Sequence, residues 1–158
     1  MNENRIRKDQ YYLNIAKEVA RRGTCLRRNY GAVIVKNDEI ISTGYTGAPR
    51  GFDNCCDLGV CKREELKIPS GERYELCRSV HAEANAIISA SRKDMIGSTL
   101  YLVGLDAKTG EVVSGAQADC CKMCRRIVIN AGIDRVVIMN GDNNRKIIYP
   151  MTYKEWRE

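Results

Sequence analysis

The chain has 158 residues, 44% of them hydrophobic, which suits one compact domain with a single core. No apolar stretch approaches the ~18 residues of a membrane span and the first ten residues are polar, so we expect a cytoplasmic protein with reduced thiols. The formal net charge is +6, but the basic residues are scattered without a run of like charges, so the charge favours no strong conclusion; we expect neither a membrane nor a nucleic acid as partner.

The first part of the chain predicts a helix followed by a hairpin. Asp9 is placed to cap a helix whose apolar residues recur at helical spacing as far as Gly23. Residues 30–35 and 40–45 read as two strands, and the polar turn at 36–38 joins them as a β-hairpin. Residues 46–77 then show no sustained period.

The second part alternates helices and strands. We expect a buried helix at 81–92, strands at 99–104 and 111–113, a helix at 121–131 with Gly132 at its C-cap, strands at 135–139 and 145–149, and a helical turn at 152–158. This order favours a three-layer α/β/α fold with a mixed, roughly five-stranded sheet. Residues 1–158 are thus expected to form one domain with a cysteine-rich insertion at about 46–77.

The cysteine content is high for a protein of this kind. There are eight cysteines and a single histidine, His81. In a reducing compartment such an abundance indicates metal binding or catalysis rather than disulfides.

Two short motifs together predict a catalytic zinc site. His81 and Glu83 open one predicted helix, and Cys121 and Cys124 open another after 37 intervening residues. Cysteines at i and i+3 face the same side of a helix, and the helix dipole favours their thiolates. One imidazole and two thiolates leave the fourth tetrahedral position to water, from which Glu83 can take a proton. A CxxC alone is equally typical of a redox protein or a zinc ribbon, so the combination carries the prediction.

The combination resembles the zinc-dependent nucleobase deaminases, whose pattern is H-x-E followed by P-C-x-x-C. Residues 31–35, 44–49 and 81–87 are similar to the deoxycytidylate deaminase branch, which includes bacterial late-competence proteins. The resemblance covers roughly residues 10–140. It implies a cytidine-deaminase-like domain that hydrolyses dCMP to dUMP and ammonia, with zinc hydroxide attacking C4 and Glu83 carrying the proton.

The resemblance also implies binding partners. The expected substrate is dCMP, the expected assembly is a homo-oligomer (hexamer or dimer), and dCTP and dTTP are the expected allosteric effectors. Thr46, Arg50 and Ala82 are the candidate substrate contacts. Arg73, Arg78 and Arg92 are further candidates for the phosphate, although arginines in such places more often form surface ion pairs.

The sequence departs from the family pattern at three places. Cys120 stands where the family usually has proline, which removes a fixed φ and adds a thiol beside the ligands. Thr46 stands where the family usually has asparagine beside the nucleotide. The loop at 105–120 is longer than expected, and we expect it to shape the mouth of the pocket.

The remaining cysteines suggest a second, structural zinc. Some members of the family resemble this chain at Cys25 and at residues 54–57 and use such residues for that purpose. Our hypothesis is a closed four-thiolate site made by Cys25, Cys55, Cys61 and Cys77, with Cys56 as the first substitute. The alternative is that these cysteines are small buried apolar side chains.

Two other functions remain open from the sequence. One is deamination of another base or nucleoside, such as cytidine, a modified pyrimidine or adenosine in tRNA. The other is a zinc-stabilised, non-catalytic competence-type protein, against which the intact Glu83 argues. Ammonia release from a panel of substrates separates these readings.

Overall fold

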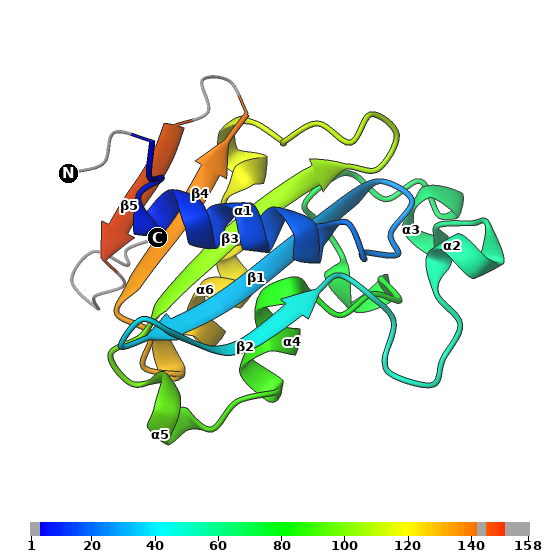
Figure 1. Cartoon of the computed structure of the whole chain (residues 1–158). Helices are drawn as coiled ribbons and strands as arrows, with labels where there is room; N and C mark the ends of the chain where they lie inside the picture. Colours follow the sequence, from blue (N-terminus) through cyan, green and yellow to red (C-terminus); the bar gives the residue numbers. More distant parts are fainter. Residues whose placement is uncertain (1–3, 142–144, 151–158) are drawn as a thin grey trace.

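An open mixed sheet of five strands forms the middle layer of the computed structural model, which describes residues 4–141 and 145–150 (Figure 1). The strand order is β2-β1-β3-β4-β5. β3 and β4 are parallel, and the other neighbouring pairs are antiparallel. This confirms the predicted mixed sheet. The strands are β1 Arg28–Lys36, β2 Glu39–Tyr45, β3 Thr99–Asp106, β4 Arg135–Asn140 and β5 Arg145–Pro150.

Helices cover both faces of this sheet, as the three-layer prediction requires. α1 crosses one face, and α4 and α6 lie on the other (Figure 1). The longer helices are α1 Lys8–Ala20, α4 Ala82–Ile88 and α6 Lys122–Asn130, and the short ones are α2 Cys55–Leu58, α3 Lys62–Glu65, α5 Arg92–Met95 and the 3₁₀ turns η1 Tyr74–Leu76 and η2 Gly115–Ala118.

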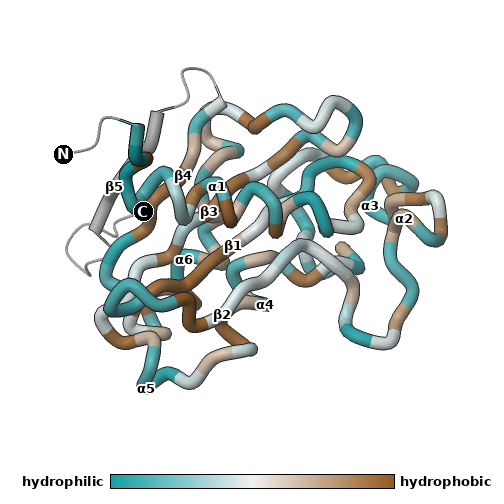
Figure 2. The backbone as a smooth tube through the Cα atoms, viewed as in Figure 1, coloured by the Kyte–Doolittle hydropathy of each residue, from teal (hydrophilic) through white to brown (hydrophobic). Residues whose placement is uncertain are grey.

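Alternate side chains of the central strands supply two separate cores. In β1, Ala32 and Ile34 belong to the cluster on the α4 and α6 side, whereas Val33 and Val35 belong to the cluster under α1. Successive side chains of a strand point to opposite faces, so a strand covered on both faces needs an unbroken apolar run. Figure 2 shows this run along β1.

Gly44 allows α4 to pack directly on β2. A Cβ at this position would lie 2.3 Å from the Ala86 nitrogen and 2.4 Å from the Ala82 oxygen, both backbone atoms of α4. No side-chain rotation relieves such a clash. The glycine therefore sets the distance between β2 and α4, the helix that begins just after His81.

We expect Gly44→Ala to destabilise the fold by about 3 kcal/mol, because a clash with backbone forces α4 away from the sheet. Gly47→Ala is the matched control, since its added Cβ would meet nothing closer than 3.5 Å. The two free energies of unfolding are compared by urea denaturation. Equal values for the two variants would contradict this account of Gly44.

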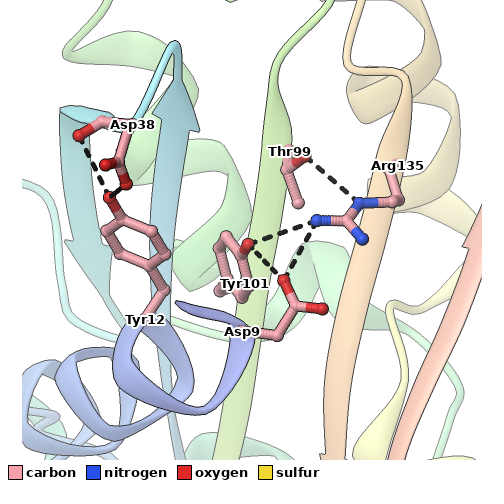
Figure 3. Close-up of polar contacts among 6 residues, drawn as sticks. All are labelled: Asp9, Tyr12, Asp38, Thr99, Tyr101 and Arg135. Atoms are coloured by element: carbon pink, nitrogen blue, oxygen red, sulfur yellow. Dashed lines mark hydrogen bonds and ion pairs between the residues drawn. The ribbon is translucent and has the colours of Figure 1, made fainter. Parts of the chain in front are cut away.

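The predicted cap of the first helix is wrong. α1 begins at Lys8 with Arg7 at the N-cap, so Asp9 lies inside the first turn. Its Oδ1 instead accepts hydrogen bonds from Tyr101 Oη at 2.7 Å and Arg135 Nη2 at 3.0 Å (Figure 3). These partners belong to β3 and β4, so Asp9 fastens α1 to the sheet rather than capping it. Tyr12 also links α1 to the sheet, because its hydroxyl donates a hydrogen bond to the Asp38 carboxylate at the β1–β2 turn (Figure 3).

The helix predicted at 81–92 is two helices. α4 ends at Ile88, and a new helix, α5, starts after Ser91, whose side chain accepts from the Asp94 amide at 3.2 Å. Serine hydroxyls compete for backbone hydrogen bonds, which favours caps over helix interiors. The strand predicted at 111–113 is a single bridge between Leu105 and Val112. The turn predicted at 152–158 lies outside the described residues.

The segment at 46–77 is not devoid of structure, because it contains α2, α3 and η1. α2 and α3 lie beyond the end of the sheet where β1 begins and β2 ends (Figure 1). Within residues 4–141 and 145–150, no helix is long and apolar enough to cross a membrane.

Candidate functional site

A cavity of about 300 Å³ lies at this end of the sheet. Its walls come from the start of β1, the residue after β2, the segment at 46–77, the residues at the beginning of α4 and α6, and the loop that precedes α6. Elements that are distant in sequence therefore line the same cavity. Its volume is at the lower end of the range typical of small-molecule sites.

Three of the predicted ligands meet at one side of this cavity. His81 is the N-cap residue of α4 and Cys121 is the N-cap residue of α6, whose first turn contains Cys124. His81 Nδ1 lies 3.2 Å from Cys124 Sγ and 3.6 Å from Cys121 Sγ. Among the described residues, these form the one group of metal-ligating side chains whose ligand atoms all lie within 4.8 Å of one another.

The spacing of these atoms fits zinc. Zinc bonds of about 2.0–2.1 Å to nitrogen and 2.3 Å to sulfur place tetrahedral ligands roughly 3.5 Å apart. The group offers three protein ligands, the number that a catalytic site uses when it keeps its fourth position open. The residues present therefore fit a catalytic zinc ion.

Hydrogen bonding within the group favours a thiolate at Cys121. Hydrogen bonds from the Cys124 thiol and His81 lower the pKa of Cys121 to about 4, whereas the same pairing and burial raise the pKa of Cys124. The Cys124 backbone amide also points at Cys121 Sγ, at 3.4 Å. The start of α6 thus stabilises negative charge on a ligand, as predicted from the helix dipole.

Glu83 lies beside the ligands and is almost completely buried, with 4% of its surface exposed. It lines the cavity together with His81 and Cys121. Burial raises the pKa of its carboxyl, because a charged group loses its hydration there. A carboxyl that holds a proton more readily than usual suits a group that must both accept and return one.

The three predicted substrate contacts lie in different places. Thr46 is buried and lines the cavity, and its Oγ1 accepts from the Tyr30 amide at 2.9 Å. Ala82 is fully buried in the core between α4 and the sheet. Arg50 is exposed and donates to Ser89 Oγ at 3.2 Å, away from the cavity lining.

The arginines that line the cavity are not those expected from the sequence. Arg73, Arg78 and Arg92 are absent from its lining, which instead includes Arg27, Arg28 and Arg63. Arg27 directly precedes β1 and Arg28 is its first residue, and this position next to an apolar run was the one signal available in the sequence.

These three arginines differ in their partners. Arg27 forms an ion pair with Glu64, and Arg63 is buried with its guanidinium donating to backbone carbonyls of Pro69 and Glu72. Arg28 donates to the Ser70 hydroxyl at 3.3 Å and has no carboxylate partner in the described part of the chain. Arg28 is therefore the arginine of the cavity whose charge is available to an anion.

The long loop before α6 forms part of the wall, as expected. Ala116, Gln117 and Asp119 line the cavity. Tyr30 joins this loop to β1, because its hydroxyl donates to the Gln117 carbonyl at 2.7 Å. Burial raises the pKa of Tyr30 to about 12, so the hydroxyl remains a donor near neutral pH.

Cys120 lies outside the group formed by His81, Cys121 and Cys124 although it adjoins Cys121. Its side chain is buried in the core on the α6 side, and its backbone amide donates to Asp119 Oδ1 at 2.7 Å. Proline could not make that bond because it has no amide hydrogen. The cysteine thus permits a loop conformation that orders Asp119 at the cavity wall.

Three of the cysteines predicted to bind a second metal, Cys25, Cys61 and Cys77, lie close enough to the fourth, Cys55, for their charges to act on it. Burial is the largest cause that raises the pKa of Cys55, and the charges of Cys25, Cys77 and Cys61 add to it. Cys25 and Cys77 also line the cavity.

Comparisons with known proteins agree with this site. Residues 6–140 match the family described as the cytidine and deoxycytidylate deaminase zinc-binding region. The chain is 36% identical over 134 residues to a deoxycytidylate deaminase of Mycobacterium phage D29, across 82% of this chain and 91% of that protein. It is 38% identical over 104 residues to a deoxycytidylate deaminase of Schizosaccharomyces pombe, across 65% of this chain and 32% of that protein.

Among solved structures, the dCMP deaminase from the cyanophage S-TIM5 in complex with dCMP and dUMP superposes with a TM-score of 0.54. The identity is 23%, and the match covers 84% of this chain and 82% of that one. At this identity the likeness bears on the fold, and it confirms the predicted fold class.

Proposed function

The chain belongs to the cytidine and deoxycytidylate deaminase family, and we propose that it hydrolyses dCMP to dUMP and ammonia. The single observation that carries the proposal is the buried Glu83 beside the His81, Cys121 and Cys124 group, in a cavity that also presents Arg28. A structural zinc site has no use for such a carboxylate, whereas hydrolysis of an amino-substituted ring does.

Each residue of the group has one role in this proposal. His81, Cys121 and Cys124 hold the zinc, which when bound supplies a water of lowered pKa. Glu83 accepts one proton from the attacking water and delivers it to N3 of the pyrimidine ring; it then takes the second proton from the new hydroxyl at C4 and delivers it to the departing amino group. Water adds at C4, the bond from C4 to the amino nitrogen breaks, and ammonia leaves.

Arg28 is the proposed partner of the 5′-phosphate, with the Ser70 hydroxyl beside it. A guanidinium can grip a phosphate through paired charge-assisted hydrogen bonds. Arg28 stands at the start of β1 and Ser70 in the 46–77 segment, so a bound phosphate would join the insertion to the sheet. This replaces Arg50 as the preferred phosphate contact, because Arg50 does not line the cavity.

Ammonia release from a panel of substrates tests the proposal. The panel contains dCMP, CMP, 5-methyl-dCMP, deoxycytidine, cytidine and adenosine. We expect the highest kcat/KM with dCMP. Preference for a nucleoside would favour the related enzymes considered above, and no ammonia from any of them would favour the non-catalytic reading.

We also propose that Cys25, Cys55, Cys61 and Cys77 bind a second, structural zinc. The electrostatic effect of Cys25, Cys61 and Cys77 on Cys55 supports this, and such a site would tie the insertion to the residues just before β1. The thiols must draw closer than they are here, because they do not form a group within 4.8 Å. A site of this kind would add its binding free energy to folding.

Elemental analysis of protein purified without chelator should therefore find two zinc ions per chain, and one after Cys61→Ser. Cys56→Ser is the control, since Cys56 is exposed and should not alter the count. One zinc in the unmodified protein would rule out the second site.

The other expectations from the family remain proposals. We propose a homo-oligomer, either a hexamer or a dimer, controlled by dCTP and dTTP and located in the cytoplasm. The sequence resemblance supports these points.

A further inference from the structure

Tyr74 and Arg63 form a stack that ends on the metal ligand His81. The rings of Tyr74 and His81 meet nearly at right angles, at 86°, with 5.2 Å between their centroids. The Arg63 guanidinium carbon lies 4.7 Å from the centroid of the Tyr74 ring. All three side chains line the cavity.

Hydrogen bonds to the backbone of the turn at 69–72 hold the Arg63 side chain in place. It is only 7% exposed, and its Nη2 donates to the Pro69 and Glu72 carbonyls at 3.1 and 2.8 Å while Nε donates to Glu72 at 3.1 Å. The turn at 69–72 is therefore wrapped around its guanidinium. Tyr74 follows that turn directly, so its ring is held against a rigid cation.

His81 lacks the partner that usually orients a zinc ligand. A zinc-bound histidine generally donates its second ring nitrogen to a carboxylate or carbonyl, which fixes the plane of the ring. Nδ1 of His81 faces the two cysteines, but Nε2 has no hydrogen-bond partner among residues 4–141 and 145–150. Besides the contacts of Nδ1 with the two cysteines, the ring contact with Tyr74 is the observed restraint on the plane of this side chain.

We infer that Tyr74, backed by Arg63, is a positioning residue that fixes the imidazole plane of His81 for zinc. The stack performs the orienting task of the missing hydrogen bond. It also couples the 46–77 insertion to the metal site, because Arg63 holds the turn at 69–72 that leads into Tyr74. The inference rests on the proposed function only in taking His81, Cys121 and Cys124 as zinc ligands.

Zinc affinity in the absence of substrate tests the inference. We expect Tyr74→Leu to weaken binding about tenfold or more in competition with a chromogenic chelator, whereas Tyr74→Phe keeps the ring and the affinity. The affinity measured is that of the zinc at the His81, Cys121 and Cys124 group, which is identified as the zinc that the Cys121→Ser variant no longer binds. Tyr11→Leu removes an exposed ring from α1, away from the cavity lining, and should leave the affinity unchanged. Tyr74→Met, with a flexible apolar side chain, replaces Tyr74→Leu if the latter does not fold.

A merely structural role predicts a different result. Tyr74→Leu would then lower the melting temperature of the zinc-free protein and bind zinc as the unmodified protein does, which would overturn the inference. Equal losses in Tyr74→Phe and Tyr74→Leu would also overturn it, because the hydroxyl and not the ring would then matter. A protein that binds zinc normally but does not deaminate dCMP would refute the proposed function and leave this inference intact.

Discussion

The Glu83→Gln variant is expected to retain its zinc and to lose deamination by a factor of about 10²–10⁴. Glutamine keeps the shape of the side chain but cannot accept and return a proton, and general acid–base groups typically contribute a factor of this size. Zinc binding should survive because Glu83 is not in the group formed by His81, Cys121 and Cys124. The measurements are kcat with dCMP and zinc content by elemental analysis.

Glu39→Gln is the matched control, because Glu39 is exposed at the start of β2 and touches no part of the cavity lining. It should keep both activity and zinc. Full activity in Glu83→Gln would eliminate the proposed proton transfer, and loss of zinc in that variant would instead make Glu83 part of the metal site.

Discrimination between dCMP and deoxycytidine is the second large effect that we expect, with kcat/KM higher for dCMP by a factor on the order of hundreds. A site built to hydrogen-bond one group rejects an analogue that lacks it, because buried donors are then left unpaired. Arg28→Gln should remove most of this preference by lowering kcat/KM for dCMP while changing that for deoxycytidine little.

Arg50→Gln provides the comparison for Arg28→Gln, since it makes the same change at an exposed arginine that does not line the cavity. It should leave the preference for dCMP intact. A loss of preference in Arg50→Gln alone would transfer the phosphate contact to the residue expected from the sequence. Equal kcat/KM values for dCMP and deoxycytidine in the unmodified protein would mean that no phosphate site exists.

The grouping of His81, Cys121 and Cys124 could be predicted from sequence because local spacing places each of them at a helix start. His81, Cys121 and Cys124 each lie at or near a helix start, and the short distances between motif residues leave few other arrangements. The unbroken apolar run of β1 was equally readable, since a strand covered on both faces must be apolar throughout. Local rules were enough for these features.

Features that depend on distant partners could not be read in the same way. Asp9 has the properties of a helix cap, but Tyr101 and Arg135, on strands far along the chain, bind its carboxylate instead. Arg28 became a phosphate candidate only once the folded chain placed it beside Ser70 and without a carboxylate partner in the described part. In each case the role of the charged side chain depended on which partners lie beside it in the folded chain. Those partners are far away in sequence, so local patterns do not identify them.

Hydrolysis of dCMP in ¹⁸O-labelled water by the zinc-loaded protein tests the central claim most directly. We predict one ammonia released for each dUMP formed, with one labelled oxygen at C4 of the product, because the attacking water becomes the new carbonyl oxygen. Unchanged dCMP after incubation with the zinc-loaded protein, or dUMP without the label at C4, would contradict the proposal that this chain is a hydrolytic dCMP deaminase.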